Sequence, residues 1–207
     1  RALWSPRGPG GGGGAGPPGG RPGGGGAAPP LSRIVAAGRL TRQKGFDLLI
    51  RAVAPILRRR PEVRLTILGA GPEESALRSL AESLGVWDSV SLPGFVENPY
   101  RFFKAAGLFV LSSRWEGLPN VVLEALACGT AVVAFDCAGG AMRELARIAS
   151  EVELVPPGDV DALGKTIENE LKGEKTGLGS SLLPSRFRLD AALRRFEGAF
   201  LDIRNPA

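Results

Sequence analysis

Short apolar runs alternate with amphipathic segments of helical length along most of this 207-residue chain. The run at 33–37 predicts a buried strand, and the segment at 46–60 has apolar residues at helical spacing. Alternation of this kind, with short loops, favours an α/β fold in which helices cover both faces of a parallel sheet. The expected strands are 33–37, 63–68, 90–92, 108–111, 131–135 and 153–155. The expected helices are 46–60, 73–84, 100–106, 119–127, 142–147, 159–172 and 187–203.

Residues 1–30 do not share this pattern, because they are mostly glycine and proline. A segment with so few apolar side chains cannot offset the entropy lost on ordering, and we expect it to be disordered. It lacks the apolar stretch of a signal peptide. The chain does not begin with methionine, and we expect a fragment or a processed product. Residues 31–207 suffice for one domain with its own core, and no apolar run in them approaches the roughly 20 residues that span a bilayer.

The net charge of +5 overstates how basic this domain is, because Arg1, Arg7 and Arg21 lie in the glycine- and proline-rich segment. The remaining charge is too small to indicate a nucleic-acid-binding surface, so we expect no nucleic-acid partner. The arginine clusters at 58–60 and 194–195 are typical of solvated helix ends. A weak preference for a membrane surface stays open as the alternative.

Histidine is absent from the whole chain, which excludes histidine metal ligands and histidine general bases within it. The two cysteines, Cys128 and Cys137, are nine residues apart in apolar surroundings. Free cysteines in such surroundings are typical of reduced core residues in a cytosolic protein. We therefore expect a cytoplasmic location.

The segment that follows the fourth expected strand carries the main functional signal. Pro119 suits the first position of a helix, since its missing N–H would have no partner there. The amides of Asn120 and Val121 would then point out of the helix start, where partial positive charge favours an anion. Glu116 precedes the helix and Glu124 lies about one turn inside it. Both side chains can therefore reach the N-terminal end of the helix. Because carboxylates accept hydrogen bonds from sugar hydroxyls, the pattern indicates a phosphate joined to sugars. A helix with one capping and one solvated glutamate stays open on spacing alone.

The residues of this segment also resemble a known family. Glu116-Gly117-Leu118-Pro119-Asn120 followed by Glu124-Ala125-Leu126-Ala127-Cys128-Gly129 is similar to the Glu-x7-Glu region of retaining glycosyltransferases of family 4, which have the GT-B fold. The resemblance implies that Glu116 contacts the donor sugar and Glu124 the nucleotide ribose. It also implies donor contacts for the residues between them, Gly117, Leu118, Pro119, Asn120 and Val121.

Two further loops resemble the same family. Gly38-Arg39-Leu40 with Lys44-Gly45 is similar to its basic loop after the first strand. The resemblance assigns Arg39 and Lys44, with Gly38, to the donor diphosphate, which needs cationic donors. Gly94-Phe95-Val96 is similar to the loop beside the nucleotide base, which implies base contacts for Phe95 and Val96. A strand-to-helix turn with Phe95 in the core stays open as the alternative for that loop.

Three other motifs are interpreted as structural. Gly69-Ala70-Gly71 lacks the third glycine of a dinucleotide-binding fingerprint, so a tight turn is favoured over a dehydrogenase site. Asp159-Val160-Asp161 opens a helix, where aspartate is a common cap, and it is not expected to bind a metal. Glu144, after the glycine pair at 139–140, is expected to pair with Arg143 or the backbone rather than to act in catalysis.

With the resemblance, residues 31–207 are expected to form the Rossmann-like, C-terminal donor-binding half of a GT-B fold, including a C-terminal helix. The implied reaction transfers a sugar, with retained configuration, from a nucleotide-diphosphate sugar of the UDP or GDP type to a glycan or lipid-linked acceptor. Arg39, Lys44 and Glu116 are the implied catalytic residues, and no metal or other cofactor is implied.

The acceptor-binding N-terminal domain of that family is expected to be missing from this chain, and a lipid-linked acceptor implies a position at the inner face of the cell membrane. Two alternatives stay open. The first is a catalytically silent module that only binds a nucleotide sugar. The second is another GT-B enzyme, such as a sugar-nucleotide epimerase.

Overall fold

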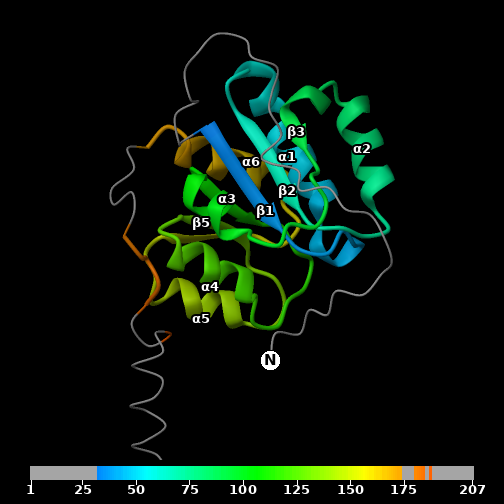
Figure 1. Ribbon diagram of the computed structural model, residues 1–207. Helices are drawn as coiled ribbons and strands as arrows, with labels where there is room; N and C mark the ends of the chain where they lie inside the picture. Colours follow the sequence, from blue (N-terminus) through cyan, green and yellow to red (C-terminus); the bar gives the residue numbers. More distant parts are fainter. Residues whose placement is uncertain (1–31, 174–179, 185–186, 188–207) are drawn as a thin grey trace, which may run out of the picture.

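The computed structural model describes residues 32–173, 180–184 and 187. Its centre is a six-stranded parallel sheet with the strand order β3-β2-β1-β4-β5-β6 (Figure 1). The strands are β1 (Arg33–Ala37), β2 (Arg64–Leu68), β3 (Val90–Ser91), β4 (Leu108–Leu111), β5 (Val132–Phe135) and β6 (Val152–Val155). The predicted α/β fold with a parallel sheet is therefore confirmed.

The two central positions of the sheet are occupied by β1 and β4, which pair in parallel. All residues of β4 and β5 are buried, whereas β2 begins with the exposed Arg64. Helices on both faces of a sheet leave its inner strands no solvated side, so such strands are continuously apolar rather than alternating. The run Leu108-Phe109-Val110-Leu111 is apolar for this reason.

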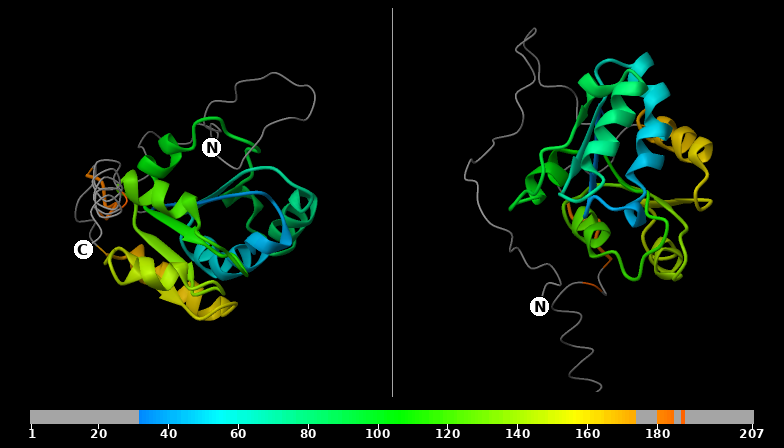
Figure 2. Two further views of the ribbon diagram at one scale, coloured as in Figure 1. Left: turned by 90° about the horizontal axis from the view of Figure 1, so that it is seen from below. Right: turned by 90° about the vertical axis from the view of Figure 1, so that its right-hand side faces the viewer.

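Helices pack on both faces of this sheet. They are α1 (Phe46–Arg59), α2 (Glu74–Ser83), α3 (Tyr100–Ala105), α4 (Asn120–Ala127), α5 (Ala141–Ala146) and α6 (Val160–Glu170). One core includes Leu49 and Leu163 and lies between the sheet and α1, α2 and α6. The other includes Phe103 and Leu126 and lies between the sheet and α3, α4 and α5. Figure 2 shows the sheet between these helical layers.

The ends of the predicted strands and of the six helices that the structure describes differ from the observed ends by no more than about two residues, the usual uncertainty of element boundaries. Two short 3-10 helices, Arg42–Lys44 and Trp87–Ser89, are not predicted, because a single turn is too short to show periodicity. The expected helix at 187–203, apart from Phe187, and the expected disorder of 1–30 lie outside the described residues. Among the helices that the structure describes, none has the length and apolar character needed to cross a bilayer.

Gly69-Ala70-Gly71 serves backbone contacts between loops at the carboxyl edge of the sheet. A Cβ atom at Gly69 would overlap the carbonyl oxygen of Gly38. The Leu40 amide donates to the Ala70 carbonyl at 3.0 Å, and the Gly69 amide donates to the Gly94 carbonyl at 2.8 Å. The motif is therefore structural, but the turn begins only at Gly71, whose carbonyl accepts from the Glu74 amide at 3.3 Å.

Leu126→Ala should destabilise the fold, because Leu126 is fully buried in α4. Truncating a buried leucine to alanine costs about 2–5 kcal/mol, since the cavity it leaves is only partly refilled. Leu118→Ala is the matched control, because Leu118 is 52% exposed just before the same helix and should cost less than about 0.5 kcal/mol. Urea unfolding of both variants measures the difference, and equal costs would contradict the assigned core.

Candidate functional site

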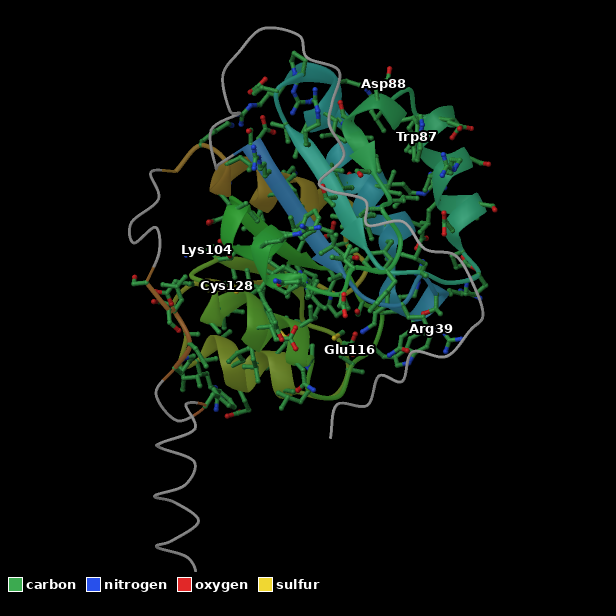
Figure 3. The ribbon with its side chains drawn as sticks, in the orientation of Figure 1. Arg39, Trp87, Asp88, Lys104, Glu116 and Cys128 are labelled. Carbon is green, nitrogen blue, oxygen red and sulfur yellow. The ribbon has the colours of Figure 1, made fainter. Side chains whose placement is uncertain are left out.

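The candidate site lies at the carboxyl ends of β1 and β4, where the strand order of the sheet changes direction. Ligands of open parallel sheets bind outside this point. The loop from β1 to α1 supplies residues 38–45, and the loop from β4 to α4 supplies residues 112–119. Figure 3 shows Glu116 and Arg39 on this side of the molecule, whereas Trp87 and Asp88, which precede β3, lie at the far end.

Lys44 and Glu116, from these two loops, form a direct ion pair. Lys44 Nζ lies 2.5 Å from Glu116 Oε1, and the Ser113 hydroxyl donates to the same oxygen at 2.7 Å. Both charged side chains are largely enclosed, with 19% of Lys44 and 9% of Glu116 exposed. All side-chain hydrogen bonds that Glu116 forms with the described residues use Oε1, so Oε2 keeps its lone pairs for another donor.

Helix α4 begins at Asn120, four residues after Glu116. Pro119 is its N-cap residue rather than its first helical residue, which corrects the predicted start. The φ of Pro119, −79°, fits a helix, but its ψ of 92° is extended. No side chain among the described residues caps this end, and the amides of Asn120 and Val121 have no acceptor within the helix. The helix start therefore presents the unpaired amides that an anion site requires, and the binding of an anion there stays a prediction.

Glu124 lies about one turn inside α4 and is half-buried. Its carboxylate forms no hydrogen bond or ion pair with the described residues, and burial raises its pKa above the ordinary value. Partial burial without a donor is unfavourable for a carboxylate, and a ligand hydroxyl would supply the missing hydrogen bond. The structure thus joins Lys44 to Glu116, while Glu124 has no bond to either.

The loop after β1 holds the other predicted cation. Arg39 is exposed at the same edge of the sheet as Glu116, and its side chain forms no ion pair with the described residues. The side chain of Lys44 lies against Gly38, where an added Cβ would approach the Lys44 side-chain carbons to 3.1 Å. Gly38 therefore makes room for Lys44, while the Arg39 guanidinium lies in solvent.

The loop at 94–96 places Phe95 at the surface, with an exposed fraction of 46%. The alternative that put Phe95 in the core is wrong, because Val96 is the residue of this loop that packs against the core. Within the loop after β4, Gly117 and Leu118 are exposed and Pro119 is buried. The assignment of Phe95 and Val96 to a nucleotide base stays a prediction.

Two motifs outside the site behave as ordinary helix features. Asp159 Oδ1 accepts an amide hydrogen from the first turn of α6 at 2.9 Å, which confirms that this aspartate is a cap. Glu144 pairs with Arg147 at 3.3 Å and not with Arg143, because residues three apart on a helix face each other and adjacent residues do not. The part of the chain that the structure describes contains no cluster of three or more side chains able to hold a metal ion.

Both cysteines are free thiols, and Cys137 lies close enough to Glu116 for that carboxylate to raise the pKa of its thiol. Cys137 is buried after β5, and Cys128 is half-buried at the end of α4. Burial raises the pKa of both thiols, and nearby carboxylates raise it further. Such thiols stay protonated at neutral pH and are poor nucleophiles. Figure 3 places Cys128 near Lys104, to the left of Glu116.

Two serines that the sequence analysis misses help to hold the site. The Ser112 hydroxyl donates to the Lys44 carbonyl at 3.0 Å, and Ser113 donates to Glu116. The two loops approach closely at Gly45, where a Cβ would overlap the Ser112 carbonyl oxygen. Serine directly after a strand has no spacing signature, so only the position of these serines beside Glu116 could have drawn attention to them.

Comparison with known proteins gives a family match over most of the described domain. The family model described as "Glycosyl transferases group 1" matches residues 28–178.

Curated relatives carry related names. The N-acetylgalactosamine-N,N'-diacetylbacillosaminyl-diphospho-undecaprenol 4-alpha-N-acetylgalactosaminyltransferase of Campylobacter jejuni is 41% identical over 112 residues, which are 54% of this chain and 30% of that protein. The lipopolysaccharide core biosynthesis glycosyltransferase LpsE of Rhizobium meliloti is 34% identical over 163 residues, which are 76% of this chain and 46% of that protein. The chain therefore spans less than half the length of either relative.

A solved structure shows the same fold. HepE from Anabaena, in complex with UDP, matches 83% of this chain and 49% of its own with a TM-score of 0.70 and 24% sequence identity. The described domain therefore corresponds in fold to about half of that protein.

Glu124→Gln should raise the free energy of unfolding at neutral pH. The folded state raises the pKa of Glu124, so folding is opposed wherever the carboxyl group would be ionised in the unfolded chain. The gain should be largest above the folded-state pKa and should vanish below the ordinary value of 4.5, where both states are protonated. Glu82→Gln, at an exposed glutamate of α2, is the control and should change little. Denaturant unfolding at about pH 7 and about pH 3.5 measures the effect, and an equal gain at both would contradict burial as its cause.

Gly45→Ala should destabilise the fold more than Gly85→Ala. Both glycines have a left-handed backbone, with φ of 62° and 68°, so alanine costs about 1–2 kcal/mol at either position. A Cβ at Gly85 would meet nothing within 4 Å, whereas a Cβ at Gly45 would also overlap the Ser112 carbonyl oxygen. The difference between the free energies of unfolding of the two variants measures the cost of this overlap. Equal losses of stability would show that the loops do not approach as described.

Proposed function

This chain belongs to the glycosyl transferases group 1 family, and from this premise we propose that residues 32–173 bind a nucleotide-diphosphate sugar, the donor of a retaining sugar transfer. The ion pair of Lys44 with Glu116, in the loop that leads into α4, is the observation that carries the proposal. This loop therefore brings a cation and a carboxylate together beside the start of a helix. A ligand with phosphates and sugar hydroxyls needs this combination.

The diphosphate of the donor would lie at the amides of Asn120 and Val121, with Lys44 and Arg39 as its cations. A helix start and two cations offset the charge of a diphosphate without a metal ion. Arg39 suits this role because its guanidinium is exposed at the carboxyl edge.

The sugar and the nucleoside would occupy the two sides of the diphosphate. Glu116 Oε2 would accept a hydrogen bond from the donor sugar, and Glu124 from the ribose. The half-buried, unbonded carboxylate of Glu124 gains a donor on ligand binding, which supports this assignment. Phe95 and Val96 would contact the base.

In the proposed reaction, the bond between the anomeric carbon and the diphosphate oxygen breaks, and an acceptor hydroxyl bonds to that carbon on the same face of the sugar. The hydroxyl proton passes to a phosphate oxygen of the leaving diphosphate, so the step uses no histidine of this chain, which has none. Lys44 and Arg39 stabilise the negative charge that develops on the leaving group. Glu116 orients the sugar.

We propose a glycan or a lipid-linked sugar as the acceptor, bound by a second domain. The name of the Campylobacter jejuni relative includes a diphospho-undecaprenol-linked acceptor, and that of the Rhizobium meliloti relative refers to lipopolysaccharide core biosynthesis. Both names describe the extension of a glycan. A lipid-linked acceptor would bring this protein to the cytoplasmic face of a membrane as a peripheral partner.

A catalytically silent module that only binds a nucleotide sugar is the second candidate. The two candidates differ in what happens to a bound sugar nucleotide. A donor half with its catalytic residues in place would release the sugar slowly to water, whereas a silent module would leave the sugar nucleotide intact.

Calorimetric titration of the 207-residue chain with UDP, GDP and ADP tests donor binding. We expect one diphosphate to bind, and we expect Lys44→Ala and Arg39→Ala each to cost about 1–3 kcal/mol of binding free energy, the scale of lost charged hydrogen bonds. Lys104→Ala is the matched control, because Lys104 is in the last turn of α3, away from Glu116 in Figure 3, and should leave binding unchanged. A folded chain that binds none of the three diphosphates would refute the proposal.

A further inference from the structure

A second ion pair joins the two loops of the site. Arg114 lies two residues before Glu116, and Asp47 lies three residues after Lys44, in the first turn of α1. The Arg114 guanidinium donates to both oxygens of the Asp47 carboxylate, each at 2.8 Å. Its Nη1 also donates to the Arg42 carbonyl at 2.7 Å. One side chain of the loop after β4 therefore holds the chain on both sides of Lys44.

Hydrogen bonds of the neighbouring residues run in both directions between the loops. The Arg114 amide donates to the Gln43 carbonyl at 2.8 Å, and the Gln43 side-chain amide donates to the Trp115 carbonyl at 3.0 Å. Lys44 follows Gln43 in the chain, and Glu116 follows Trp115. The distance between the Lys44 and Glu116 side chains therefore depends on the register of these bonds.

The pair of Arg114 with Asp47 is better suited to orientation than to fold stability. The side chains are 26% and 39% exposed, and partly exposed ion pairs contribute little to the stability of a fold. A bidentate guanidinium–carboxylate contact does fix the relative orientation of the two side chains, because both groups are planar. The hydrogen bond from Arg114 lowers the pKa of the Asp47 carboxyl group, so the pair is charged at neutral pH.

We propose that Arg114 and Asp47 are positioning residues, which hold Lys44 and Glu116 at the spacing at which the diphosphate and the sugar bind. The inference rests on the proposed function, because it requires a ligand that Lys44 and Glu116 both contact. The charged groups of Arg114 and Asp47 are occupied by each other and by the Arg42 carbonyl. Their replacement should weaken ligand binding through the geometry of Lys44 and Glu116.

The test measures the dissociation constant of the full chain for the diphosphate among UDP, GDP and ADP that binds. Arg114→Ala and Asp47→Asn should each weaken binding by about tenfold, since small displacements of binding groups are costly. Arg114→Lys should fall between wild type and Arg114→Ala, because lysine keeps the charge and loses the planar fork. Arg59→Ala is the matched control, as it breaks the ion pair of Arg59 with Glu168 (2.9 Å) in the last turn of α1 and should leave the affinity unchanged.

Amide hydrogen exchange in the ligand-free chain gives a second readout. Arg114→Ala should speed exchange at 42–45 and 112–116, whereas Arg59→Ala should not. A purely structural role predicts similar losses of thermal stability in both variants with unchanged affinity, and that result would overturn the inference. A wild-type chain that binds no diphosphate overturns the proposed function and this inference together. Binding by wild type that is lost in Lys44→Ala but kept in Arg114→Ala overturns this inference alone.

Discussion

Parallel pairing of β1 with β4 is the constraint on which the site depends. Ile34 pairs with Leu108 in this register, so the loops that follow the two strands leave the sheet at the same edge. Lys44 and Glu116 meet there although 72 residues separate them in the chain. A slip of one residue would turn every side chain of a strand to the opposite face, and the close packing of a separate core on each face opposes such a slip. The register of the core therefore also sets the geometry of the polar site.

The ion pair of Lys44 with Glu116 resolves an electrostatic conflict within that geometry. A carboxylate that is 9% exposed is costly unless a cation or several donors compensate it. Lys44 and Ser113 compensate Glu116 before any ligand is present. An anionic ligand that approaches Lys44 therefore meets a carboxylate whose charge is already balanced. The same lysine can then serve both the protein and the ligand.

The fold is largely predictable because each element has a local signal, such as the continuous apolar run of β4. The start of α4 is not predictable in this way, because Pro119 has a helical φ and the surrounding loop sets its extended ψ. The family resemblance of two separate loops singles out Glu116 and Lys44, and the structure shows their contact. The pair of Arg114 with Asp47 joins positions 67 residues apart, and no local pattern predicts so distant a contact. The exposure of Phe95 likewise depends on how its loop meets the core.

The strand order also decides how readily this sheet could recruit a strand from another molecule. Its two outer strands are β3, which has two residues, and β6, which carries the exposed Glu153. Long, flat and apolar edges promote aggregation, because their unpaired backbone groups can extend the sheet. A very short strand at one border and a charged side chain at the other disfavour such growth. A small molecule can therefore reach the polar groups at the carboxyl ends of β1 and β4, while the two outer strands disfavour pairing with a neighbouring sheet.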